Sequence, residues 1–345
     1  MASNYNILVT GGSGYFGSLL LDKTKNYFSN SYNFDLIKNE DSEVKTFLGD
    51  IRDYDAIYNC TKNIDIIFHN VAQVPIAKNK DLFESVNITG TENLLKAAFK
   101  NNVQKVVLTS SSAIFGVPKS NPVDENTKPT PMDPYGKAKF EGELLCKKYI
   151  KQGVDISIIR PRTILGHGRL GIFQIIFDWI KNGYNVPVIG KGDNLYQFVH
   201  ASDLADACIS ASLLKGSEIF NCGAKEFGTM YDLLNSLCVH ANTGSRVSHL
   251  PKNLTIFLMK LTSKLNISPL GDYHSLMYDK SMYFSNDKTY NMLNWNPKYS
   301  NEEMIKESYD WYLENHKKIG MSTNERSAHK SKIKQGVLSI VKRII

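Results

Sequence analysis

Three glycines at regular spacing lie between two apolar runs near the start of the chain. In LVTGGSGYFGSLL (8–20), Gly11, Gly14 and Gly17 follow a run that predicts a buried strand and open a pattern that predicts a helix. Glycine is unfavourable inside either element, so three of them indicate a turn with special backbone requirements. In a strand–turn–helix unit the glycines allow a sharp turn, backbone approach to a pyrophosphate, and close packing of helix on strand. The helix then presents free N–H groups to the anion, which predicts a dinucleotide site.

Short β-branched runs alternate with helical patterns through the first half of the chain. Strands are expected at 6–10, 32–35, 65–72, 103–111 and 155–160, with helices at 15–28 and 135–152 among them. Buried strands that alternate with helices predict an α/β fold, a doubly wound parallel sheet of the Rossmann type. The alternation fades after about residue 165. Later helices are expected at 172–182, 203–214, 229–241 and 301–315, mixed with short strands.

This pattern divides the chain into three expected parts. Residues 1–165 form the dinucleotide-binding domain, to which residues 190–215 return. A smaller substrate-binding lobe covers 166–316. A basic linker and an amphipathic tail occupy 317–345.

The net charge of +7 is concentrated in that last part. From residue 317 onward there are eight lysines and arginines against one acid, Glu325, and eight minus one is the whole excess. The body is therefore close to neutral, which argues against nucleic acid as a partner. The five cysteines form no Cys-x-x-Cys pair and the histidines show no ligand spacing, so we expect neither a disulfide framework nor a metal site.

The tail itself has helical spacing. In KIKQGVLSIVKRII (332–345) the branched apolar residues fall on one side, and Lys342 and Arg343 fall on the other. Such a helix can lie on an anionic membrane surface, or it can pack on the body or on a second subunit. No secretory signal or bilayer-length apolar run is visible, so we expect a cytoplasmic protein, peripheral at the membrane if the tail binds lipid.

An acid follows the glycine turn at an informative place. Asp35 ends the next expected strand, where a carboxylate accepts hydrogen bonds from the adenosine ribose hydroxyls. Such an acid repels a 2′-phosphate, and the turn contains no arginine or lysine. NAD is therefore favoured over NADP as the cofactor.

Two further motifs supply the chemistry. TSSSAIFG (109–116) ends a strand, and YGKAK (135–139) opens a helix with Tyr135 and Lys139 four residues apart on one face. A phenol titrates near pH ~10, but a nearby ammonium and an oxidised nicotinamide ring both lower its pKa. Tyr135 could then take a proton from an alcohol while hydride leaves for NAD, with a serine hydroxyl holding the same oxygen.

Taken in order, these residues resemble the extended short-chain dehydrogenase/reductase superfamily, in its NAD-dependent epimerase/dehydratase group. The resemblance covers roughly residues 5–315. It implies that Ser111, five residues before Gly116, is the catalytic hydroxyl, with Tyr135 as base and Lys139 as its electrostatic partner. It also implies a homodimer joined through 85–101 and 135–152. The implied cofactor-binding residues are Gly11, Gly14, Tyr15, Phe16, Gly17, Asp35, Asp50, Ile51, Val71 and Ala72, with Tyr135 and Lys139.

Two departures from the family pattern bear on the substrate. Dehydratase members carry an Asp-Glu pair after the catalytic hydroxyl, and this chain has Ser112-Ala113, which argues against dehydration. Sugar-nucleotide epimerases commonly place an arginine for the substrate diphosphate where this chain has Tyr196. Arg162 and Arg169 are alternative sources of that charge. The candidate substrate contacts are Ser112, Arg162, Arg169 and Tyr196.

Three functions stay open on this basis. The leading one is NAD-dependent oxidation and epimerisation of a secondary alcohol on a nucleotide sugar, 4-epimerase-like, through a keto intermediate. The second is a 3β-hydroxysteroid-dehydrogenase-like oxidoreductase acting on a sterol or lipid alcohol, favoured by the missing diphosphate arginine and the amphipathic tail. The third is a non-catalytic NAD-binding protein, which the intact Ser111, Tyr135 and Lys139 set argues against.

Overall fold

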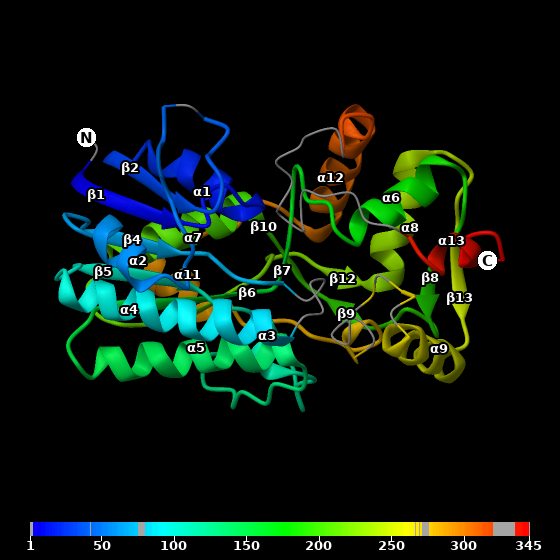
Figure 1. Cartoon of the computed structure of the whole chain (residues 1–345). Helices are drawn as coiled ribbons and strands as arrows, with labels where there is room; N and C mark the ends of the chain where they lie inside the picture. The colour runs from blue at the N-terminus through cyan, green and yellow to red at the C-terminus, as the bar shows by residue number, and fades with distance from the viewer. Residues whose placement is uncertain are drawn as a thin grey trace.

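The computed structural model describes residues 3–41, 43–74, 80–265, 267–268, 270, 276–319 and 335–344. Within them a seven-stranded sheet forms one lobe, and a smaller, mainly helical lobe lies beside it (Figure 1). Residues 332–334 and 345 of the expected tail, and most of the expected linker, lie outside the described residues.

The large sheet is parallel throughout. Its strands, in spatial order, are β3 (Lys45–Leu48), β2 (Phe28–Asp35), β1 (Ser3–Thr10), β4 (Ile66–His69), β5 (Lys105–Thr109), β6 (Ile156–Pro161) and β11 (Ile219–Cys222). The strand order reverses between β1 and β4, where Thr10 pairs with His69. The residues that follow these two strands therefore meet at one edge, which is where doubly wound sheets bind their ligands.

Helices cover both faces of the sheet. Ile7 and Val9 of β1 pack towards α1 and α7, whereas Leu8 points to the opposite face against α2, α4 and α5. Because Ile7, Leu8 and Val9 are all buried, this part of β1 is apolar on both faces of the sheet. The helices around this sheet are α1 (Tyr15–Thr24), α2 (Tyr54–Cys60), α3 (Lys80–Leu82), α4 (Gly90–Lys100), α5 (Pro134–Ile150), α7 (Ala201–Leu213) and α11 (Asp287–Leu293), with a π-helix at Phe83–Thr89 and a 3₁₀ turn at Ser112–Phe115.

The second lobe has its own apolar core. Phe177 and Trp179 of α6 pack there with Leu237 of α8 and Tyr309 of α12. Its helices are α6 (Phe173–Lys181), α8 (Met230–Ala241), α9 (Lys252–Lys264), α12 (Asn301–Asn315) and α13 (Leu338–Val341). Three two-stranded sheets complete it and join it to the large lobe: β7 (Thr163–Leu165) with β10 (Phe198–His200), β9 (Leu195–Tyr196) with β12 (Gly228–Thr229), and β8 (Val186–Ile189) with β13 (Val247–Leu250).

The α/β fold with a doubly wound parallel sheet is confirmed. Two of the seven strands, β3 and β11, were not expected, because each has only four residues and shows no alternation that separates it from a loop. Helix α9 was also not expected. The proposed domain limits and the homodimer through α4 and α5 stay predictions.

Candidate functional site

The glycine turn lies at the switch between β1 and β4. Gly11 has φ +74°, and a Cβ there would come within 3.1 Å of the Val71 backbone nitrogen. A Cβ on Gly17 would come within 2.0 Å of the Gly11 carbonyl oxygen, so only glycine lets α1 approach the turn this closely. The N-cap of α1, Gly14, offers no side chain to its N–H groups. The first turn of α1 therefore suits an anionic phosphate.

Two side chains of β2 form hydrogen bonds with the glycine turn. Asn33 accepts a hydrogen bond from Gly12 N at 3.0 Å and donates to Ser13 Oγ at 3.0 Å. The Asp35 carboxylate accepts from Ser13 N at 3.0 Å. Asp35 thus lies at the end of β2 beside the turn, as expected. Asn33 was missed, because a single buried amide has no sequence pattern of its own.

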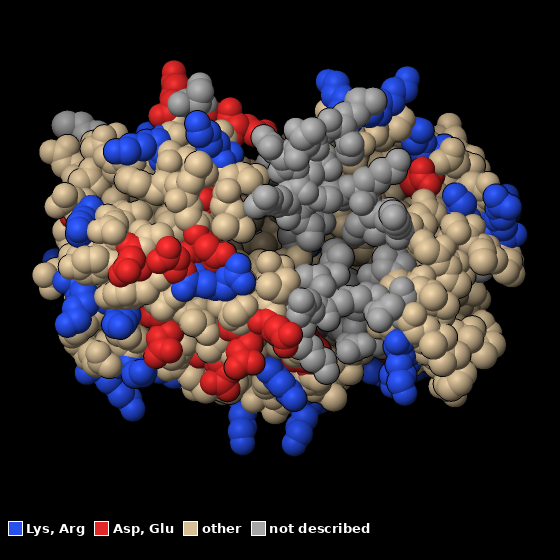
Figure 2. All heavy atoms as spheres, in the orientation of Figure 1, with Lys and Arg blue, Asp and Glu red and all other residues tan. Residues whose placement is uncertain are grey.

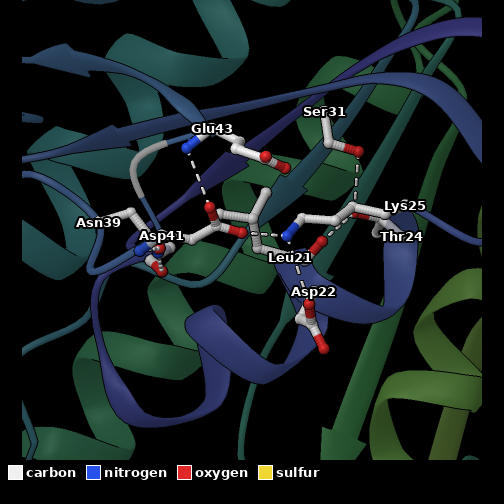
Figure 3. A network of polar contacts seen from close by, with 9 residues as sticks. Leu21, Asp22, Thr24, Lys25, Ser31, Asn39, Asp41 and Glu43 are labelled. Carbon is white, nitrogen blue, oxygen red and sulfur yellow. Dashed lines mark hydrogen bonds and ion pairs between the residues drawn. The ribbon is translucent and has the colours of Figure 1, made fainter.

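The segment after Asp35 is also tied to the turn. Asn39 donates to the Gly12 carbonyl at 2.6 Å and accepts from Asp41 N at 2.9 Å. The Asp41 carboxylate meets Lys25 at the end of α1, and Lys25 also contacts Asp22 (Figure 3). These ion pairs are at the surface and contribute little each, but together they keep this segment against α1.

Ser111 and Tyr135 meet at the ends of β5 and α5. The Ser111 hydroxyl caps the 3₁₀ turn by accepting from Ala113 N at 3.1 Å, and it lies near enough to the Tyr135 phenol to favour the phenolate. Asp133 caps α5 by accepting from Tyr135 N at 3.0 Å and from Gly136 N at 3.1 Å. These two caps fix both hydroxyls on rigid backbone, a requirement for proton transfer at a defined place.

The protein alone does not lower the pKa of this phenol. Burial raises the pKa of Tyr135 to about 12, and the nearby Ser111 hydroxyl and the charge of Arg169 oppose that rise. The expected lowering by the ammonium together with an oxidised nicotinamide ring stays a prediction, because it concerns the enzyme with NAD bound. The Lys139 ammonium donates to the Thr109 backbone carbonyl at 2.6 Å.

Lys139 is a buried cation with an unusual environment. Its side chain is 8% exposed, and burial lowers its pKa to about 8, against the opposing charge of Glu143. Its hydrogen bond to Thr109 fixes it at the end of β5. Thr109 in turn donates through Oγ1 to Asn70 after β4 at 2.5 Å. Lys139 therefore links α5 to the two central strands.

Glu143, one turn after Lys139, organises a buried network that sequence reasoning missed. It is completely buried and accepts from Arg160 Nε at 3.0 Å and Nη2 at 2.7 Å. Ser110 Oγ donates to the same carboxylate at 2.6 Å. The spacing from Tyr135 to Lys139 to Glu143 could have indicated it, because all three share one helix face. The network locks α5 against β5 and β6.

One cavity of about 370 Å³ joins the glycine turn to the second lobe. Ser111, Tyr135 and Lys139 lie in its wall between the two ends. Of the residues predicted from the sequence, it brings together Gly11, Gly14, Tyr15, Phe16, Gly17, Ala72, Ser111, Ser112, Tyr135, Lys139, Arg162, Arg169 and Tyr196. The far end is apolar, a feature not predicted from the sequence. Its lining there includes Ile172, Phe173, Ile176, Met230, Leu233, Leu234 and Ile305.

Four predicted cofactor residues do not line this cavity: Asp35, Asp50, Ile51 and Val71. Asp35 and Val71 contact the glycine turn through the interactions given above. The Asp50 carboxylate is bound by the Arg52 guanidinium, which lowers the Asp50 pKa. Ile51 is buried, close to the backbone of Gly90 at the start of α4.

Arg162 is buried in the cavity wall with donors to spare. Its Nη1 donates to Ser112 Oγ at 2.9 Å, and its guanidinium lies 4.7 Å from the centre of the Tyr196 ring. Nε and Nη2 are buried and have no hydrogen-bond partner among the described residues. An unpaired buried guanidinium nitrogen is costly, so these two donors indicate a place for an anionic group.

Arg169 adds a second cation to the same wall. Its Nε donates to the Ile164 carbonyl at 3.1 Å, its guanidinium stacks 5.5 Å from the centre of the Tyr15 ring, and Nη1 has no partner in the described structure. Burial lowers the pKa of Arg169 to about 10, so it stays charged at neutral pH. Two cations thus flank the Ser111–Tyr135 pair.

Asn87 holds the loop after β4. Its side chain accepts from Gln73 N at 2.7 Å and donates to the Gln73 carbonyl at 3.1 Å. Gln73 lines the cavity between the glycine turn and the serines. The amide therefore positions one wall of the site.

Comparison with known proteins shows which family has this arrangement of residues. The model of the NAD dependent epimerase/dehydratase family matches residues 7–223. The chain belongs to this family. This family member is therefore an NAD-dependent enzyme of the extended short-chain dehydrogenase/reductase type, as the resemblance implied, and it is not a bare NAD-binding protein.

Relatives of this family member differ in what they act on. The protein y4nG of Sinorhizobium fredii, named as uncharacterized, is 47% identical and aligns over 97% of this chain and 85% of its own length. The N-acetyl-alpha-D-glucosaminyl-diphospho-ditrans,octacis-undecaprenol 4-epimerase of Escherichia coli O157:H7 is 28% identical over 76% of this chain and 82% of that protein. The sterol-4-alpha-carboxylate 3-dehydrogenase, decarboxylating, of Mus musculus is 28% identical, with 76% of each covered.

A solved structure shows the same fold. The UDP-glucose 4-epimerase of Thermotoga maritima matches with a TM-score of 0.75 at 22% identity, over 90% of this chain and 99% of that one. At this identity the similarity concerns the arrangement of sheet and helices.

Proposed function

We propose that this enzyme oxidises a secondary alcohol on a nucleotide sugar and returns the hydride to the other face of a keto intermediate, as a 4-epimerase does. One observation carries the proposal. Ser111 and Tyr135 line the same cavity as the glycine turn, and the wall of that cavity also holds two arginines whose side chains keep donors without a partner among the described residues.

The chemistry assigned to the chain is a proton transfer at a fixed oxygen. Ser111 holds the substrate hydroxyl, and the Tyr135 phenolate removes its proton while the carbon–hydrogen bond breaks. The glycine turn and Asp35 would hold NAD, which would supply a hydride acceptor and a positively charged ring that favours the phenolate. Since protein groups alone raise the pKa of Tyr135, deprotonation of the phenol is coupled to the presence of the oxidised cofactor.

Arg162 replaces the arginine that the family places before β10. That position is Tyr196 here, and the Arg162 guanidinium lies directly against the Tyr196 ring. We assign Arg162 and Arg169 to the diphosphate of the substrate, because a guanidinium binds phosphate oxygens through two parallel N–H groups. Ser112 orients Arg162 through the 2.9 Å hydrogen bond.

The test is epimerisation by the purified protein. UDP-linked hexoses and N-acetylhexosamines are incubated without added NAD, and bound nucleotide is identified by mass spectrometry. We expect turnover with co-purified NAD, and loss of about 10²–10⁴-fold in Tyr135→Phe with NAD still bound. Turnover that needs external NAD and accumulates a ketone identifies a simple dehydrogenase. Full activity in Tyr135→Phe contradicts the assignment.

A second candidate is oxidation of a sterol or lipid alcohol. The apolar far end of the cavity, formed by residues such as Phe173, Ile176 and Leu233, favours a hydrocarbon body, and the mouse relative is named for a sterol. NADH absorbance with a sterol panel, run beside the sugar nucleotides, separates the two candidates.

A further inference from the structure

Helix α9 turns an apolar face away from the protein. The residues of this α9 face are Leu254, Phe257, Leu258, Leu261 and Leu265, and they are between 42% and 62% exposed. Their spacing of three and four places them on one stripe of the helix. Only Ser263 of the whole helix is buried, and it belongs to the opposite side. Five large apolar side chains in one exposed stripe mark an interaction surface.

The C-terminal tail adjoins this helix. Val337 N donates to the Ile267 carbonyl, just after α9, at 3.1 Å. Leu338 and Val341 pack against the core of the lobe, whereas Ile340 and Ile344 stay exposed. The alternative in which the tail packs on the body therefore holds for the described residues. Its helix α13 lies in the same lobe as α9 (Figure 1), and the two exposed isoleucines add apolar surface to this lobe.

The tail is anchored by specific contacts. Gln335 accepts from Trp179 Nε1 at 3.1 Å and donates to Asp178 at 2.9 Å. Lys342 lies 3.9 Å from the Asp178 carboxylate and against the Tyr184 ring. The tail is thus held in place without covering the α9 face.

The surroundings of this face are positively charged. Residues 233–271 contain Arg246, Lys252, Lys260 and Lys264 and no acid, and residues 335–345 contain two cations and no acid. Asp279 and Asp178, from elsewhere in the chain, pair with Lys252 and Lys342. Lys260 and Lys264, on the flank of the stripe, form no ion pair with any described residue. Acidic side chains gather on the other lobe in the view of Figure 2, and few are seen on this one.

We propose that the α9 face, together with the exposed isoleucines of the tail, binds an anionic lipid surface. An amphipathic helix with lysines beside its apolar stripe lies in the headgroup region, with its apolar side chains below and its ammonium groups at the phosphates. No described helix is long and apolar enough to cross a membrane, so the contact is peripheral.

Charge favours lipid over a second copy of the chain. A twofold interface brings the same patch of both subunits together. Here that would oppose lysines with lysines, since the segment has no acid to pair with them. A phospholipid surface supplies the missing negative charge and an apolar interior at once.

Vesicle sedimentation tests the proposal with the full chain. We expect binding to vesicles of equal parts phosphatidylcholine and phosphatidylglycerol, little to phosphatidylcholine alone, and release when salt rises from about 0.1 M to about 1 M. Phe257→Ser with Leu261→Ser should lower the partition coefficient at least about tenfold. Lys260→Gln with Lys264→Gln should lower it about tenfold on the anionic vesicles only.

Controls keep the result independent of catalysis. Leu213→Ser removes a side chain that is 51% exposed at the end of α7 on the other lobe, and its binding should equal that of the wild type. NAD content should be unchanged in every variant, so a failed proposed function leaves this test intact. Equal sedimentation of the Phe257/Leu261 variant overturns the proposal. The proposal is also overturned if the wild type binds no vesicles and is a dimer in ultracentrifugation, whereas the Phe257/Leu261 variant is a monomer.

Discussion

Two buried arginines lie two residues apart at the end of β6, and their surroundings are opposite. Arg160 is 2% exposed and meets the Glu143 carboxylate through two hydrogen bonds inside the large lobe. Arg162 is 1% exposed, has a single hydrogen bond to Ser112, and keeps two nitrogens without a partner in the described structure. A satisfied buried cation supports a fold, and an unsatisfied one in a cavity wall is available to a ligand. We therefore assign Arg160 to the stability of the fold and Arg162 to substrate binding.

The largest change in stability is expected when the ion pair between Arg160 and Glu143 is broken. Glu143→Leu leaves Arg160 charged and unpaired in the core, and we expect the free energy of unfolding to fall by about 3–5 kcal/mol. Urea unfolding followed by circular dichroism measures it. Adding Arg160→Met to the same chain should recover most of the loss, because two apolar side chains then replace the ion pair. A double variant as unstable as the single one would show that α5 depends on other contacts.

At Arg162 we expect a substitution to impair catalysis with substrate and to leave stability almost unchanged. Arg162→Met should change the free energy of unfolding by less than about 1 kcal/mol, because the guanidinium has little to lose in the protein itself. With a diphosphate substrate, loss of two charge-assisted hydrogen bonds should lower kcat/KM about 100-fold, mainly through KM.

Arg162→Lys sharpens this test. It keeps the charge but loses the planar fork, so an intermediate KM is expected. Wild-type kinetics in Arg162→Met would remove this residue from the substrate site. A stability loss comparable to that of Glu143→Leu would make it a structural arginine like its neighbour.

Sequence reasoning found the parts of the site that depend on local spacing. Gly11, Gly14 and Gly17 act within one turn, and Tyr135 and Lys139 share a helix face, so both patterns are visible in a few residues. Local spacing does not show which of the two arginines forms an ion pair with an acid. Arg160 is satisfied only because α5 brings Glu143, 17 residues earlier, against β6. That pairing depends on tertiary packing.

The same reasoning explains the missed surface. The stripe of α9 has the spacing of an ordinary amphipathic helix, and such stripes usually face a core. Only the position of α9 at the outside of the second lobe shows that Phe257 and Leu265 remain exposed. Expectations about the tail were partly right for this reason: its spacing predicted an amphipathic segment, but packing decides that Leu338 and Val341 face the protein.

Lys139 is a third buried cation, and it extends the comparison to pH. Unlike the arginines it can lose its proton, and burial lowers its pKa to about 8 from about 10.4 in the unfolded chain. The unfolded state therefore binds more protons between these values, so stability rises with pH across that window. We expect the wild type to gain on the order of 2 kcal/mol between pH 8 and pH 10 relative to Lys139→Met.

Over the same pH interval, kcat should fall while stability rises. Loss of the ammonium removes the hydrogen bond to Thr109 and the positive charge at the site, so kcat should fall about tenfold per pH unit above about 8. Parallel urea titrations and rate profiles of the wild type and Lys139→Met measure both. If stability and rate fall together above pH 8, unfolding and not Lys139 sets the alkaline limit, and this lysine belongs with Arg160 as a structural cation.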